Sequence, residues 1–246
     1  MTYALGARYM TLTHTRNTDW ADAAGDQPKH HGLTQFGEEV VREMNRIGMM
    51  VDLSHVTEET MRAALKVSQA PVIFSHSSAW ALCKSRRNVP DDVLATSARN
   101  GGVVMVCFLP GYLTARGRVA LAASEAEKER LRKLCPENSP HYQKAFDAWC
   151  RKHSSLHGSS LTDVADHIDH VREVAGIHHV GIGSDFDGFD GAPDGLEDVS
   201  WYPALLAELM RRGYTPEEIK QVAGLNLLRV FREVEKVSAQ LKRDKQ

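Results

Sequence analysis

Hydrophobic and polar positions along this chain alternate between two patterns. Short apolar runs, bounded by glycine, proline or polar residues, predict five β-strands at 9–13, 49–54, 71–75, 103–108 and 179–184. Apolar residues at intervals of three and four predict amphipathic helices at 34–47, 57–68, 90–99, 162–175, 200–212, 216–223 and 225–240. Strands that alternate with helices are typical of right-handed βαβ units around a parallel sheet.

The segment 110–160 interrupts this alternation. It is polar, rich in lysine, arginine and glutamate, and predicts helices near 120–134 and 141–152. We interpret it as a helical insertion on the side of the sheet where the strands end, and its charges as the solvated face of surface helices. The chain as a whole, 1–246, is then long enough for a single large domain with a well-buried core.

The predicted fold class is α/β, of the (β/α)8 TIM-barrel type, with an incomplete barrel. A closed barrel has eight strands in typically about 250 residues. The pattern here predicts five strands and places none before residue 9. We therefore expect the last five strands with their helices, in a chain that starts after the first part of the barrel. The strands at 9–13 and 179–184 would then be unpaired edges, which promote aggregation.

Composition narrows the choice of partners. The 246 residues carry a formal net charge of -2, which gives no electrostatic reason to bind nucleic acid. No apolar run approaches the roughly 20 residues that span a bilayer. The first residues lack a basic segment followed by an apolar one, so we expect no membrane segment and a cytoplasmic location. A homodimer is compatible with this composition and is the commonest state of soluble oligomers.

Two histidines follow the ends of neighbouring predicted strands. His55 and His76 each come one residue after a serine and lie 21 residues apart, about one β/α unit. Because parallel barrel strands end at one rim, we expect the two imidazoles side by side, where they could bind zinc. The alternative is a pair of strand-end histidines that form hydrogen bonds with neighbouring loops.

Three more polar residues follow strand ends. His14 could be a third metal ligand, a donor to a carbonyl that becomes negative in the transition state, or a structural histidine under Trp20. Asp185 follows a strand with two glycines and could pass a proton to a leaving amine, and its loop lacks the spacing of a calcium hand. Arg87, directly after Arg86, could clamp a substrate carboxylate, or the pair could form surface ion pairs.

The sequence His167-Ile-Asp169 has the H-x-D pattern that is common in the metal sites of β/α barrels. It lies inside the predicted helix 162–175, whose apolar face comprises Leu161, Val164, Ile168 and Val171. That periodicity turns Asp169 toward solvent, so we reject the pair as metal ligands.

Several long motifs resemble the membrane (renal) dipeptidase family of zinc peptidases. They are YMTLTHTRNTDWAD (9–22), VDLSHV (51–56), PVIFSHSS (71–78), SRRNVPDD (85–92), GSDFDG (183–188) and GLNLLRVF (224–231). The motifs occur in the family's order and cover nearly the whole chain. The resemblance implies a (β/α)8 barrel with two zinc ions that hydrolyses the single peptide bond of a dipeptide by means of a metal-bound hydroxide.

The resemblance also implies a role for each candidate residue. By motif position, His55 and His76 resemble the two histidine ligands of the second zinc. His14 is similar to the histidine that contacts the substrate at the scissile carbonyl, and Arg87 to the arginine that holds the substrate. Asp185 resembles the aspartate that binds the substrate amine and shuttles the proton, so the implied catalytic pair is Asp185 and His14.

The chain also departs from the family. Neither the His-x-Asp motif that supplies the first zinc nor the glutamate that bridges the two metals has a counterpart here. We therefore expect impaired hydrolysis from this chain alone. The alternative function is that of a non-catalytic homologue that binds a ligand or partner through the same rim. A metal-free lyase or isomerase is disfavoured, because no predicted strand ends in lysine.

Overall fold

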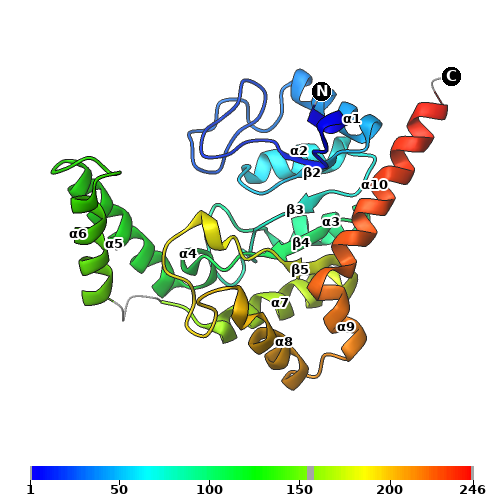
Figure 1. Cartoon of the computed structure of the whole chain (residues 1–246). Helices are drawn as coiled ribbons and strands as arrows, with labels where there is room; N and C mark the ends of the chain where they lie inside the picture. The colour runs from blue at the N-terminus through cyan, green and yellow to red at the C-terminus, as the bar shows by residue number, and fades with distance from the viewer. Residues whose placement is uncertain (1, 154–157, 245–246) are drawn as a thin grey trace.

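The computed structural model describes residues 2–153 and 158–244, and a five-stranded parallel sheet lies at its centre (Figure 1). The strands pair in chain order and are β1 (Tyr9–Thr11), β2 (Met50–Asp52), β3 (Ile73–Phe74), β4 (Val103–Val106) and β5 (Val180–Ile182). All five predicted strands are confirmed, although each is shorter than predicted. Polar residues follow the paired segments of β1, β2, β3 and β5, and the candidate residues His14, His55, His76 and Asp185 are among them.

Helices follow the strands as predicted. They are α1 (Gln35–Ile47), α2 (Glu58–Val67), α3 (Asp91–Asn100), α7 (Leu161–Ala175), α8 (Tyr202–Arg211), α9 (Pro216–Lys220) and α10 (Asn226–Arg243). Local chemistry sets their ends: the Thr57 side chain accepts a hydrogen bond from the amide of Thr60 at the start of α2. Gly48 ends α1 in the left-handed conformation that glycine adopts without steric cost.

The two faces of the sheet have different covers. One face contributes Val51, Phe74, Val104 and Val180 to the main core, which the helices after each strand complete. The opposite face contributes Met50, Ile73, Val103 and Met105, and α10 packs on it through Val230 and Val234 (Figure 1). Because α10 covers the residues near the strand starts, the polar strand ends of the same face, such as Thr11 and Ser75, stay free to line a site.

The predicted insertion contains a short helix α4 (Pro110–Leu113) and a helical hairpin of α5 (Ala115–Arg132) and α6 (Pro140–Lys152). The hairpin projects away from the sheet (Figure 1) and has its own small core of Leu131, Tyr142 and Phe146. Residues 154–157, inside the predicted insertion, lie outside the described residues.

The sheet is part of a barrel with two open edges. Within the described ranges, β1 pairs only with β2 and β5 pairs only with β4. Beside β1, the side chains of Tyr9 and Phe36 are exposed. Five of the eight strands of a (β/α)8 barrel are therefore present, as predicted, and the open edges are the places where the remaining strands of a barrel would pair.

Candidate active site at the strand ends

Three predicted histidines from three different strands meet at one rim of the sheet. The Nε2 atoms of His55 and His76 lie 2.7 Å apart, and their ring centroids are 4.8 Å apart. The His14 ring lies 4.4 Å from the His55 ring, measured between centroids. His14 is exposed, which is inconsistent with a structural histidine packed beneath Trp20. The structure thus brings together the imidazoles that the strand pattern placed on one edge.

Backbone strain marks two of the candidate site residues, His55 and Asp185. His55 has φ 69° and Asp185 has φ 62°, in the left-handed region that non-glycine residues rarely adopt. Such strain persists only where the surrounding structure determines the conformation, and it concentrates at functional sites.

A buried carboxylate that the sequence analysis missed organises the histidine loops. Asp52 has no exposed surface. Its Oδ1 atom accepts hydrogen bonds from the amides of Ser54 (3.0 Å) and Ser75 (2.9 Å). Its Oδ2 atom accepts them from the hydroxyls of Thr11 and Ser75, both at 2.6 Å. The hydrogen bonds of Asp52 therefore connect the ends of β1, β2 and β3. The available signal was an aspartate inside an apolar run, where a charge is buried only with partners.

Both candidate metal ligands are held as neutral imidazoles. Burial, followed by the positive charge of Arg87, lowers the pKa of His55 to about 3. Burial and Arg87 also lower the pKa of His76, against an opposing effect of Asp185 and Asp52. Because only the unprotonated nitrogen of a histidine binds a metal ion, this electrostatic environment favours ligation at neutral pH.

Arg87 is buried without a full set of partners. It is 8% exposed, and its guanidinium makes only long contacts, 3.5 Å to Ser77 Oγ and 3.4 Å to the carbonyl of His76. Its Nε atom has no hydrogen-bond partner. A buried guanidinium with unused donors is suited to an anion such as a carboxylate. Arg86, in contrast, is exposed. The alternative of a surface arginine that forms ion pairs therefore applies to Arg86 and not to Arg87.

The polar neighbours of Arg87 fix its loop. Asn88, almost fully buried, donates from Nδ2 to the carbonyls of Cys83 (2.8 Å) and Tyr112 (2.7 Å). The Arg87 guanidinium lies over the Tyr112 ring, 5.2 Å from its centroid. Asn88 and Tyr112, neither of which the sequence analysis singled out, thus hold the arginine in its orientation.

Asp185 lies three residues after β5 and borders an open cavity of about 350 Å³. His76, Ser75 and Thr11 line the same cavity. The glycine before this loop is required, because a Cβ atom on Gly183 would clash with the carbonyl oxygen of Ser75. The predicted close approach at this strand is confirmed, and it brings the Asp185 carboxylate to the same space as His76.

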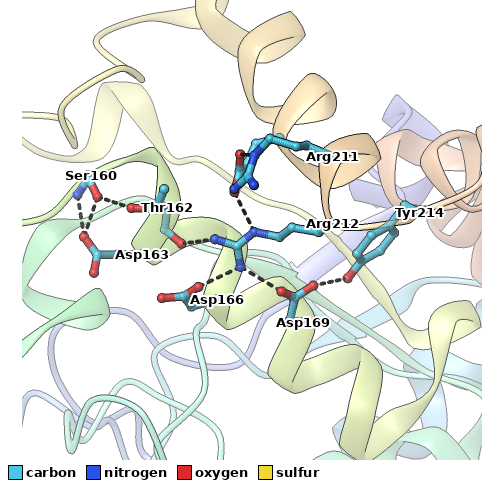
Figure 2. A network of polar contacts seen from close by, with 9 residues as sticks. Ser160, Thr162, Asp163, Asp166, Asp169, Arg211, Arg212 and Tyr214 are labelled. Carbon is cyan, nitrogen blue, oxygen red and sulfur yellow. Dashed lines mark hydrogen bonds and ion pairs between the residues drawn. The ribbon is translucent and has the colours of Figure 1, made fainter.

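The rejected pair His167 and Asp169 has structural contacts. His167 is 1% exposed, accepts a hydrogen bond from the Ala79 amide at Nδ1 (3.0 Å) and donates from Nε2 to the Leu113 carbonyl (2.9 Å). The prediction that Asp169 points to solvent is incomplete, because its side chain is 39% exposed but also has partners in the protein. Its two oxygens bind Arg212 at 2.7 Å and the Tyr214 hydroxyl at 2.8 Å (Figure 2). The residues that follow α8 pack on α7 and capture this carboxylate, which the helical periodicity of α7 alone could not show.

The residues present fit part of a metal site. In the part of the chain that the structure describes, no three His, Cys, Asp or Glu side chains are placed to hold a metal ion. The Nε2 atoms of His55 and His76 nevertheless point toward one another, 2.7 Å apart, so the two rings converge on one position. A complete site would need further ligands beside them.

A parallel β/α sheet with neutral imidazoles, a buried guanidinium and a carboxylate at its rim is typical of metal-dependent hydrolases built on β/α barrels. Comparison with known proteins defines the particular group. Residues 1–245 match the membrane dipeptidase family (peptidase family M19), and the chain belongs to this family. The family predicted from the motifs is therefore confirmed.

Individual relatives agree with this assignment. The chain is 42% identical over 242 residues to dipeptidase aclJ of Aspergillus oryzae and 44% identical over 241 residues to dipeptidase 3 of Rattus norvegicus. These matches cover 98% and 96% of this chain but 48% and 41% of the relatives. The chain thus spans less than half the length of these curated relatives.

Solved structures share the fold. The probable dipeptidase PvdM from Pseudomonas aeruginosa has a TM-score of 0.76 and 30% identity, and the match covers 95% of this chain and 64% of that chain. A metallo peptidase from Rhodobacter sphaeroides, liganded with a phosphinate mimic of the dipeptide L-Ala-D-Ala, has a TM-score of 0.74 and 27% identity. That match covers 95% of this chain and 57% of the other. The predicted barrel type is confirmed in its partial form.

Described helices give no sign of a membrane segment. None of the helices in the ranges 2–153 and 158–244 is long and apolar enough to cross a bilayer.

Proposed function

We propose that this chain provides the dipeptide-binding rim of a metal-dependent dipeptidase. The observation that carries this proposal is the convergence of the His55 and His76 Nε2 atoms, 2.7 Å apart, with the buried Arg87 acting on both imidazoles. A bound cation would face the scissile carbonyl of a dipeptide, and Arg87 would face its free C-terminal carboxylate. The two neighbouring sites therefore match two groups of the same substrate.

His55 and His76 would hold a divalent ion, and the family resemblance favours zinc. When bound, such an ion would supply Lewis-acid chemistry, which polarises a carbonyl and lowers the pKa of a water molecule. Both imidazoles are already neutral at pH 7, so neither has to lose a proton to a competing base before it binds a metal.

The remaining candidates would act on the substrate. Arg87 would bind the C-terminal carboxylate, which satisfies the Nε donor that has no partner in the protein. His14, exposed at the rim beside His55, would donate to the carbonyl oxygen as negative charge develops there. Asp185 would bind the substrate ammonium group, accept a proton from the attacking water and pass it to the leaving nitrogen.

Hydrolysis by the chain alone is expected to be weak. The described residues supply two clustered metal ligands, fewer than the three that catalytic zinc sites use. This shortage also favours the second candidate function, a non-catalytic homologue that binds a ligand through the same rim. Homodimer formation and a cytoplasmic location stay predictions from the sequence.

Calorimetric titration of the purified chain with zinc tests the metal site. We expect one ion per chain, bound by the wild type and lost in His76→Ala. The matched control is His170→Ala, which changes a partly exposed histidine paired with Asp91, away from the rim. Equal zinc binding by the wild type and His76→Ala would overturn the proposal. A phosphinate dipeptide mimic that binds the wild type but not Arg87→Ala would support the substrate site.

A further inference from the structure

A chain of hydrogen bonds joins the buried Asp52 to the ring of His76. Asp52 is the last residue of β2, and Ser75 directly follows β3. The Ser75 hydroxyl donates to Asp52 Oδ2 at 2.6 Å and lies 2.8 Å from His76 Nδ1. This series of hydrogen bonds therefore connects the fully buried Asp52 to Nδ1 of His76, the ring nitrogen that faces away from His55.

The environment of Asp52 fixes the direction of these bonds. Four donors surround its two oxygens: the amides of Ser54 and Ser75 at Oδ1, and the hydroxyls of Thr11 and Ser75 at Oδ2. Both oxygens therefore act as acceptors, as in the ionised carboxylate. The single hydroxyl proton of Ser75 points to Asp52, so Ser75 can only accept a hydrogen bond from His76. The proton of the neutral His76 ring is then on Nδ1, and Nε2 has a free lone pair.

The 2.7 Å contact between the two histidines agrees with this assignment. Because Nε2 of His76 has no proton, the hydrogen bond requires a proton on Nε2 of His55. That proton occupies the position between two nitrogens that a cation shared by both rings would take.

We propose that Asp52 is a positioning residue that acts through Ser75 to hold His76 in the tautomer whose Nε2 atom can bind a metal ion. Asp52 itself does not reach the ion. The inference rests on the proposed metal role of His76, whereas the tautomer follows from the hydrogen bonds of the protein alone. Outer-shell carboxylates that orient metal-binding histidines are a general feature of such sites.

Asp52→Asn tests the direction of the relay. The amides of Ser54 and Ser75 both donate to Oδ1, so an asparagine must keep its carbonyl oxygen there and turn its NH₂ group toward Ser75. The NH₂ group would donate to Ser75, and Ser75 would in turn donate to Nδ1 of His76. The ring proton would then move to Nε2, which cannot bind a metal. Ser75→Ala only removes the relay and leaves both tautomers accessible.

The first measurement is the tautomer of His76 in the metal-free protein, from ¹⁵N NMR at a pH of about 8, above the usual pKa of histidine. We expect Nδ1–H in the wild type, Nε2–H in Asp52→Asn and a mixture in Ser75→Ala. The control is Thr11→Val, which removes a hydrogen bond to the same Asp52 oxygen but is not on the relay, so the tautomer should not change. The signal is assigned from its absence in His76→Asn.

The second measurement is cobalt affinity. We expect a loss of about 100-fold in Asp52→Asn and about 10-fold in Ser75→Ala, the range found for outer-shell changes. An Nε2–H tautomer in the wild type, or an unchanged tautomer in folded Asp52→Asn, would overturn the inference. If Asp52→Asn does not fold, the test compares the His76 tautomer of the wild type with that of Ser75→Ala. The same tautomer in both proteins would also overturn the inference. A wild type with the expected tautomer but no cobalt binding would contradict the proposed function and leave the hydrogen-bond relay intact.

Discussion

Replacing His167 by phenylalanine is expected to destabilise the protein strongly. His167 belongs to α7, and its two ring nitrogens bind the Ala79 amide and the Leu113 carbonyl in a buried position. Phenylalanine has a similar shape but no hydrogen-bonding atoms. Each polar group left buried without a partner costs about 1–3 kcal/mol, so the two together predict a loss of about 2–6 kcal/mol in the free energy of unfolding.

This loss should depend on pH in a defined direction. Burial lowers the pKa of His167, so the folded protein keeps this ring neutral. The unfolded chain takes up the proton near the usual value of about 6.5, and below this pH the unfolded state therefore binds more protons. The wild type should lose stability as the pH falls below that value, by at most about 1.4 kcal/mol per pH unit from this residue. The phenylalanine variant lacks this contribution, so the difference between the two proteins should shrink in acid.

Urea unfolding of both proteins at a pH of about 7.5 and of about 5.5, on either side of the usual pKa of histidine, measures both effects. The other histidines titrate in both proteins, so the difference isolates His167. His170→Phe is the matched control, three residues along the same helix, where a partly exposed ring pairs with Asp91. Its cost should stay below about 1 kcal/mol. A His167→Phe variant no less stable than His170→Phe would refute the reasoning.

Three other predictions use different measurements. Arg87→Lys should weaken binding of a phosphinate dipeptide mimic by about 10- to 100-fold in calorimetry, because lysine loses one charge-assisted hydrogen bond of about 1.5–3 kcal/mol, whereas Arg86→Lys should have no effect. Asn226→Ala should lower the free energy of unfolding by about 2–3 kcal/mol, because the buried amide donates to the carbonyls of Ile177 (2.7 Å) and Val180 (2.8 Å); an unchanged urea midpoint would contradict this. Hydrogen exchange should be slower at β2–β4 than at the edge strands β1 and β5, and equal protection would argue against open edges.

Much of the fold follows from periodicity, because each buried strand and helix repeats its apolar positions with its own period. The ends of elements were less predictable. The first long helix of the insertion, expected near 120–134, begins at Ala115. Gly117 lies inside this helix and allows close packing, since a Cβ atom there would clash with the Pro110 carbonyl. Contacts between distant segments decide such cases, and the local pattern does not contain them.

The candidate site, too, was predictable only in part. The spacing of His55 and His76 predicted that they would meet, because adjacent parallel strands end at the same rim. The choice between Arg86 and Arg87 depends on which side chain the turn buries, which periodicity and composition do not show; in the sequence, only the family resemblance pointed to Arg87. Asp52 was missed because its role consists of hydrogen bonds from three strand ends, which appear only when the strands pair.

The position of each site residue in the sheet determines how firmly it is held. His55 and His76 follow β2 and β3, which have a paired strand on both sides, and their loops are joined by the hydrogen bonds of Asp52 and Ser54. His14 and Asp185 follow β1 and β5, the two open edges. The side chains proposed to bind metal are therefore organised by contacts within this chain. The side chains proposed to act on the carbonyl and the amine lie where further strands would pair, so closure of the barrel would affect these two residues most.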